Sequence, residues 1–193
     1  MKCLITFLIT VLFSQAGFSL SRAHQLKIVQ RARLEVTRNV KYDASYQQIN
    51  YPGGDVPKEI GSCADVVVRA YRALDFDFQV LIHKERGNNS DKNIDHRRCR
   101  NQIDYLKKHA LALTNNTNSS DWKPGDIVYW DLNNKGLLHT GIISDRKTRD
   151  GKPYIIHNIG PSASEEAVLE NWKVIAHFRI QSKNVPINKT QLK

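Results

Sequence analysis

Residues 127–159 read IVYWDLNNKGLLHTGIISDRKTRDGKPYIIHNI and contain three short runs of β-forming residues. The second and third runs are separated by Asp150-Gly151, a pair that favours the tip of a hairpin. We therefore predict an antiparallel sheet whose second and third strands form a hairpin with a long tip. The expected strands are residues 127–130, 139–144, 154–159 and, further along, 174–180.

Helical patterns precede these strands. Residues 25–40 have apolar side chains at helical spacing among basic ones, and Ser62 is a candidate N-cap for a helix over 62–74. A further helical region is expected over 76–113, broken at 87–92 and resuming near 103–111. Residues 42–57 have the composition of an ordered loop. Helices followed by an antiparallel sheet predict an α+β domain.

Length and charge limit the class of protein. The chain has 193 residues, of which 40% are hydrophobic, with 29 Lys and Arg against 19 Asp and Glu and a net charge of +10. These values exclude a disordered chain and a large multidomain enzyme, and they predict one domain over residues 24–182 with a disordered tail at 183–193. The positive charge suggests an anionic partner.

The N-terminus is typical of a secretory signal peptide. Lys2 precedes an apolar run at residues 3–13, and small-residue cleavage sites end at Ala16 and Ala23. The apolar run is too short for a bilayer, which needs about 20 residues. We predict a signal at residues 1–23, removal of Cys3 with it, and a periplasmic or secreted protein with no stable membrane insertion.

Cys63 is a candidate nucleophile. It follows Gly61-Ser62 at the start of an expected helix, where the helix dipole and free N–H groups lower the pKa of a thiol. The alternative is that Cys63 is a small core residue on the apolar face of that helix. Cys63 and Cys99 could also form a disulfide in an oxidising compartment.

Two histidines on the expected hairpin are candidate partners for the thiol. His139 begins the second strand and could act as the general base, and His157 on the next strand could orient it. Adjacent antiparallel strands would place the two rings side by side. The alternative for each histidine is hydrogen-bonded packing without a catalytic role.

These motifs resemble those of known families. Cysteine at a helix start, WKPGDIVYW at residues 122–130, HTGIIS at 139–144 and IIH at 155–157 are similar to the NlpC-type cell-wall cysteine peptidases, a rearranged papain-like superfamily. YPGGDVP at 51–57, SCADVVVRAYRAL at 62–74, NIDHRR at 93–98 and HNIG at 157–160 resemble a YijF-like bacterial family. That resemblance covers residues 42–180.

The resemblance implies a papain-like fold with the nucleophile at a helix N-terminus packed on a C-terminal antiparallel sheet. It implies that Cys63 is the nucleophile, His139 the general base and His157 the orienting residue. The reaction would hydrolyse an amide bond in peptidoglycan stem peptides through a thioacyl enzyme, without a cofactor or metal. Ala64-Asp65 replaces the small Ser-Gly pair usual after the cysteine, and the added carboxylate would oppose thiolate formation.

Four residues are candidates for substrate binding. Asp55, in the segment that starts at Tyr51, could hold a substrate amine, although a plain tight turn explains the same Pro-Gly-Gly composition. Arg97 could bind a carboxylate through two hydrogen bonds, although a solvated charge run is the alternative. The expected substrate-binding set is Tyr51, Asp55, Asp65 and Arg97.

Other functions fit the sequence less well. His96 and Cys99, together with the two hairpin histidines, could supply zinc ligands, but there is no second closely spaced ligand pair. Lys and Arg are scattered from end to end, which argues against a nucleic-acid partner. The remaining alternatives are an inactive papain-like module that binds cell-wall peptides or a protein, and an exported toxin. We expect a monomer.

Overall fold

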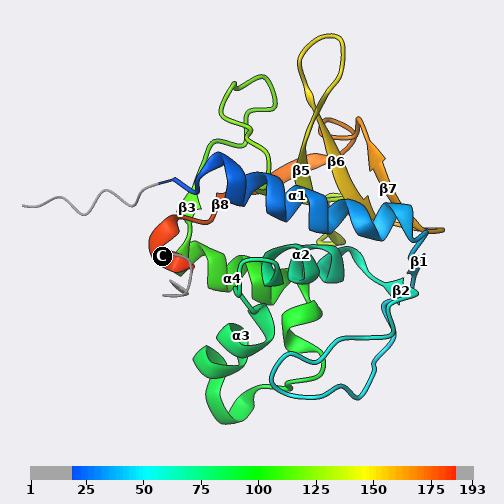
Figure 1. Cartoon of the computed structure of the whole chain (residues 1–193), viewed down its shortest axis with the longest axis vertical. Coiled ribbons are helices and arrows are strands. Elements are labelled where there is room, and N and C mark those ends of the chain that lie inside the picture. Colours follow the sequence, from blue (N-terminus) through cyan, green and yellow to red (C-terminus); the bar gives the residue numbers. More distant parts are fainter. Residues whose placement is uncertain (1–18, 186–193) are drawn as a thin grey trace, which may run out of the picture.

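The computed structural model describes residues 19–185, which form an α+β domain (Figure 1). Within this range, four α-helices accompany a six-stranded antiparallel sheet in the order β3-β8-β4-β5-β6-β7. Helices α1, α2 and α4 contact β5, and α1 continues along β6 and β7. The predicted α+β class and the antiparallel sheet are therefore confirmed.

The helices begin where the sequence provides caps. The Ser21 side chain accepts a hydrogen bond from the backbone N–H of His24, and Asp77 does the same for Gln79. Ser62 is the N-cap of α2, as predicted. Two 3₁₀ turns interrupt the helical region between α3 and α4. The helices are α1 (Arg22–Thr37), α2 (Cys63–Arg72), α3 (Phe78–Arg86) and α4 (Cys99–His109).

The hairpin that the sequence predicted is formed by β5 and β6, which pair antiparallel. Strand β7 was not predicted because its sequence, ASEE, shows no apolar alternation. The other strands that were missed have two residues each, too short for a pattern. The strands are β1 (Lys41–Tyr42), β2 (Ile60–Gly61), β3 (Leu111–Ala112), β4 (Ile127–Asp131), β5 (Leu138–Lys147), β6 (Pro153–Asn158), β7 (Ala163–Glu166) and β8 (Lys173–Arg179).

The sheet has apolar side chains on both faces. Because successive strand residues point to opposite faces, each central strand contributes to two clusters. One cluster packs against the helices, and the other is closed by the segment after β7. The helix-side cluster includes Val67, Ile127, Tyr129, Ile142 and Ile156, and the opposite cluster includes Trp122, Val128, Trp130, Ile143, Ile155 and Leu169.

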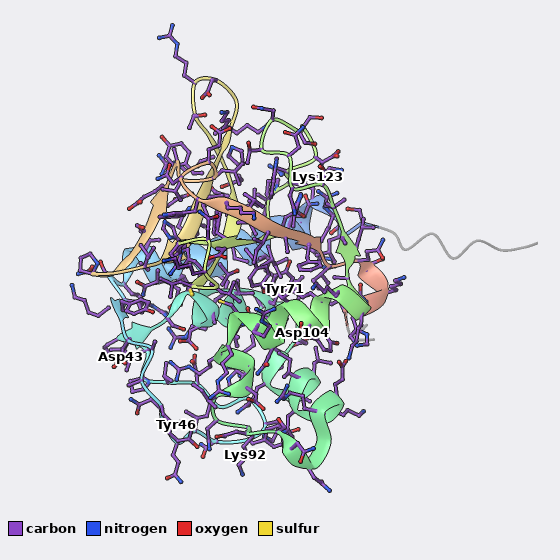
Figure 2. The ribbon with its side chains drawn as sticks, turned by 180° about the vertical axis from the view of Figure 1, so that it is seen from behind. Asp43, Tyr46, Tyr71, Lys92, Asp104 and Lys123 are labelled. Atoms are coloured by element: carbon purple, nitrogen blue, oxygen red, sulfur yellow. The ribbon has the colours of Figure 1, made fainter. Side chains whose placement is uncertain are left out.

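The Pro-Gly-Asp turn before β4 joins α2 to the sheet. Gly125 has φ +86°, a conformation that favours glycine, and its carbonyl accepts a 2.6 Å hydrogen bond from the hydroxyl of Tyr71 on α2. Tyr71 lies near the middle of the molecule (Figure 2). The next residue, Asp126, accepts hydrogen bonds from Arg179 at 2.7 Å and contacts His177 at 2.8 Å. This turn therefore fixes the position of α2 on the sheet.

The described domain starts before residue 24. Ser19 forms a β-bridge with Gln181, Leu20 is buried, and Ala23 lies in the first turn of α1. Residues 1–18 of the predicted signal, with Cys3 and Ala16, lie outside the described residues, as do residues 186–193 of the tail predicted for 183–193. The start of that tail was predicted wrongly as disordered, because residues 182–184 form a 3₁₀ turn. Between residues 19 and 185, no helix has the length and apolar character needed to cross a bilayer.

Candidate active site

Cys63 is the first residue of α2, the position at which the sequence analysis placed it. The helix start is fixed by Asp65, whose carboxylate accepts hydrogen bonds from the Ser62 backbone N–H at 2.7 Å and the Ser62 hydroxyl at 2.9 Å. The unpaired N–H groups of a first turn carry partial positive charge. The thiol is therefore held where that charge favours a thiolate.

The Cys63 thiol lies between two hydrogen-bonding groups that lower its pKa well below the usual value. The larger effect comes from a hydrogen bond with the Cys99 thiol, and a second comes from the neighbouring ring of His139. Burial opposes both, since only 7% of Cys63 is exposed. The net direction favours the thiolate.

The two histidines predicted to lie side by side do so. His139 Nε2 is 2.9 Å from His157 Nδ1, and both residues are buried. In the strand register, His157 is opposite Gly141, which has no side chain to separate the rings. Because Nε2 of His139 is engaged with His157, we infer that Nδ1 is the ring nitrogen that serves the Cys63 thiol. Cys63, His139 and His157 therefore form one chain of contacts.

His157 is a neutral member of this chain. Burial and the nearby charge of His139 lower its pKa to about 3. Its Nε2 lies 3.4 Å from the Ser164 hydroxyl and 3.7 Å from a carboxylate oxygen of Glu166, both on β7. A proton on Nε2 leaves Nδ1 as an acceptor for the N–H of His139. We infer that His157 thereby keeps His139 in the tautomer whose Nδ1 can take a proton from the thiol.

Two tryptophans form walls around the histidines. Trp130 on β4 stacks on His139 with ring centroids 5.6 Å apart, because the two residues are opposite each other in the β4–β5 register. Trp172 approaches His139 edge-on at 5.7 Å and His157 at 6.3 Å. These rings lower the local dielectric and strengthen the hydrogen bonds of the pair. No local sequence pattern predicts that these two tryptophans belong to the site. They are identified as site residues only by their proximity to the histidines in the fold.

Cys99 was considered as a disulfide partner, and the structure places it at the site as a free thiol. It is the first residue of α4, and its sulfur is 3.8 Å from that of Cys63. The hydrogen bond with Cys63 and burial raise the pKa of Cys99 well above its usual value. Cys99 therefore stays protonated and donates to the Cys63 thiolate.

Asp65 and Arg97 bind each other rather than facing separate partners. The Arg97 guanidinium donates to both carboxylate oxygens of Asp65, at 2.8 and 3.0 Å, and to the backbone carbonyl of Ser45 at 2.9 Å. Both side chains are buried. The carboxylate expected to oppose thiolate formation at Cys63 is therefore balanced by a guanidinium.

Tyr51 and Asp55 lie on the loop between β1 and β2. Asp55 is paired with Arg69 of α2 at 2.8 Å, and Arg69 also pairs with Glu35 of α1 at 2.6 Å. Tyr51 packs edge-on against the ring of His83, with centroids 4.7 Å apart. The structure thus brings the three predicted catalytic residues together, with Asp65 and Arg97 next to them, and anchors Asp55 separately.

Tyr42 is a neighbour of the site that sequence reasoning missed. Burial, followed by the negative charge of the Cys63 thiolate, raises the pKa of its phenol. The residue is 45% exposed, so its ring lies at the rim of the site rather than in its interior. Tyr42 ends strand β1, and the loop that follows runs past Asp43 and Tyr46 at the edge of the molecule (Figure 2).

The candidate zinc ligands do not assemble. Across residues 19–185, no group of three or more His, Cys, Asp or Glu side chains is arranged to hold a metal ion. His96 is buried and has no hydrogen-bond partner for Nδ1 in this structure, and its pKa is lowered to about 4, chiefly by burial.

Comparison with known proteins identifies relatives of the chain. A family model described as a domain of unknown function, DUF1287, matches residues 29–180. The uncharacterized protein YijF of Escherichia coli (strain K12) is 43% identical over 166 residues, which cover 80% of each chain. No solved structure matches. The expected relationship to a YijF-like family is thereby confirmed.

Proposed function

Since the chain belongs to the DUF1287 family, whose description assigns no activity, we propose its function from the site: it is an exported cysteine peptidase or amidase that hydrolyses an amide bond in peptidoglycan stem peptides. The observation that carries the proposal is the chain of contacts from the Cys63 thiol to His139 and from His139 to His157 at 2.9 Å. This is the arrangement that cysteine nucleophiles use.

The first half of the reaction forms a thioacyl enzyme. Nδ1 of His139 holds the thiol proton, the Cys63 thiolate attacks the amide carbonyl, and the carbonyl oxygen becomes an oxyanion. Backbone N–H groups at the start of α2, including that of Cys63, can stabilise the negative charge. His139 then donates its proton to the departing amine. His157 keeps the imidazole oriented and remains neutral throughout.

The second half returns the enzyme to its starting state. His139 accepts a proton from water as the water attacks the thioester carbonyl. The collapse of the second tetrahedral intermediate breaks the carbon–sulfur bond and releases the carboxylic acid. The proton returns through His139, so the reaction consumes one water and needs no metal or organic cofactor.

The choice of substrate class is supported by three properties of the chain. Its N-terminal sequence is that of a secretory signal, which would deliver the protein to the cell envelope. Its net charge is +10 in the full chain and remains about +8 to +9 after loss of Lys2, and of Arg22, with the signal, which favours encounter with the carboxylate-rich peptides and anionic polymers found there. Its cysteine, Pro-Gly-Asp and His-x-Gly motifs resemble those of the NlpC-type papain-like cell-wall peptidases, and the helix-on-sheet architecture is compatible with that fold.

The low exposure of Cys63 favours one second candidate, a papain-like module that binds cell-wall peptides without cleaving them. The two functions are separated by incubating purified peptidoglycan with the reduced protein and analysing the muropeptides by mass spectrometry. If the protein is a hydrolase, wild type should form pairs of new fragments whose summed mass exceeds that of the parent muropeptide by one water. Cys63→Ala should not form them.

Controls for this experiment come from the same chain. His139→Ala should abolish cleavage. Asp145→Ala should not, because Asp145 lies on the far part of β5, where it forms an ion pair with Arg33 of α1. An unchanged muropeptide profile with wild type between pH 5 and 8 would contradict the hydrolase. Retained binding of the peptides by Cys63→Ala in that case would favour the binding module, and cleavage of host proteins with intact cell wall would favour the toxin.

A further inference from the structure

Two thiols meet at the proposed site, and each begins a helix. Cys63 is the first residue of α2 and Cys99 the first residue of α4. Their sulfur atoms are 3.8 Å apart, and both are free thiols. They are 7% and 9% exposed, so each is the other's immediate neighbour in a small, largely enclosed space. The mechanism proposed above uses Cys63 as the nucleophile and forms no bond to Cys99.

The two thiols differ in protonation. The hydrogen bond with Cys99 and the neighbouring ring of His139 favour the thiolate at Cys63. The hydrogen bond between the two cysteines also favours the protonated thiol at Cys99. A thiolate is the form that reacts with peroxide, whereas a neighbouring thiol can condense with the product. The pair therefore has one member suited to oxidation and one suited to capture.

We propose that Cys99 is a resolving cysteine that captures oxidised Cys63 in a reversible disulfide. This proposal deepens the proposed function, since the disulfide would switch off the same nucleophile. The oxidant is hydrogen peroxide, a small two-electron oxidant. The Cys63 thiolate attacks one peroxide oxygen, breaks the oxygen–oxygen bond and forms Cys63 sulfenic acid and hydroxide.

The second step closes the disulfide. The sulfur of Cys99 attacks the sulfenic sulfur, the sulfur–oxygen bond breaks, and the thiol proton of Cys99 leaves with the hydroxyl as water. Overall, two thiols and one hydrogen peroxide give one disulfide and two waters. A dithiol reductant reverses the reaction by two thiol–disulfide exchanges.

The geometry requires only a small movement. A disulfide bond is about 2.05 Å long, so the two sulfurs must approach by roughly 1.8 Å from their contact distance. Rotation of the two cysteine side chains changes sulfur positions without moving either helix. Because the space around the pair is enclosed, an oxidised Cys63 meets the Cys99 thiol before it meets a second peroxide, which protects it from irreversible oxidation.

The test is peptide mapping of the full chain after peroxide treatment, with cleavage after lysine. This digestion places Cys63 in residues 59–84 and Cys99 in residues 93–107, and it separates both from Cys3. Wild type should yield the linked pair of fragments, lighter than their sum by two hydrogen atoms, and dithiothreitol should separate them. Cys99→Ser should give no linked pair and should accumulate sulfinic and sulfonic acid at Cys63. Cys99→Ala checks the same result with a second substitution.

The outcomes of the two proposals are distinguishable, because the mass map needs no hydrolase activity. A reversible link between the fragments without muropeptide cleavage supports the redox pair and contradicts the hydrolase. Cleavage that peroxide abolishes irreversibly in wild type and in Cys99→Ser alike, with the fragments never linked, overturns the resolving role of Cys99. The combined result expected is loss of cleavage with peroxide and its recovery with dithiothreitol in wild type alone.

Discussion

Replacing Asp65 by alanine should destabilise the protein severely. The carboxylate accepts two hydrogen bonds from Ser62 and two from Arg97, at distances between 2.7 and 3.0 Å, and both charged side chains are buried. Asp65→Ala removes the cap of α2 and leaves the Arg97 guanidinium without its counterion. The substitution therefore combines two separate losses at the helix that bears Cys63.

The expected magnitude follows from these losses. Removing one partner of a buried ion pair costs about 3–5 kcal/mol, and losing a helix cap costs about 1 kcal/mol. The sum of about 4–6 kcal/mol is comparable with the total stability of many domains, which is about 5–15 kcal/mol. For a chain of this size, it corresponds to a fall in Tm of roughly 10–20 °C.

Urea denaturation followed by circular dichroism measures this cost. Asp145→Ala is the matched control, since Asp145 is exposed and shares Arg33 with Glu165, and its loss should cost less than about 1 kcal/mol. The double variant Asp65→Ala/Arg97→Leu should be more stable than Asp65→Ala, because it also removes the uncompensated charge. A cost below about 2 kcal/mol for Asp65→Ala, or a double variant no more stable than the single one, would refute the reasoning.

Three further predictions concern the catalytic residues. Gly141→Ala places a Cβ 2.6 Å from Ile155 Cγ2 and 3.1 Å from the Cβ of His157, so it should cost about 1–3 kcal/mol in a urea titration and impair cleavage; wild-type stability would contradict this. The pKa of His157 is lowered to about 3, so the unfolded chain takes up a proton below about pH 6.5 that the folded chain refuses. The free energy of unfolding should therefore fall with decreasing pH by about 1.4 kcal/mol per unit for this group, and His157→Gln should show a shallower slope; parallel slopes would count against it. Because His139 helps to lower the pKa of Cys63, the rate of Cys63 alkylation by iodoacetamide should reach its plateau at a lower pH in wild type than in His139→Ala; the same pH dependence in both proteins would be the opposite result.

Local patterns predicted the parts of the fold that local physics determines. The hairpin was predictable because β5 and β6 are apolar runs separated by Asp150-Gly151, and the start of α2 was predictable from Ser62. The meeting of His139 with His157 followed from strand adjacency, which a hairpin guarantees. These predictions needed no knowledge of the distant parts of the chain.

The remaining contacts of the site come from tertiary packing. Trp172 reaches the histidines from the segment between β7 and β8, and the Cys99 sulfur meets that of Cys63 because α4 and α2 start at the same place. Arg97 pairs with Asp65 across 32 residues of sequence. Periodicity and turn composition do not predict contacts between residues this far apart in the sequence. The sequence analysis therefore assigned Arg97 to substrate binding and left Cys99 as a possible disulfide partner or zinc ligand.

The division of the site between a hairpin and a helix has a consequence for folding. His139 and His157 are 18 residues apart on strands joined by one turn, so their pairing costs little loop-closure entropy and can form early. Cys63 comes from far upstream and meets them only when α2 docks on the sheet through Tyr71. Before docking, the thiol has neither its histidine nor its neighbouring cysteine and keeps an ordinary pKa. Rapid labelling of Cys63 at mildly acidic pH would therefore report, in real time, the completion of tertiary structure.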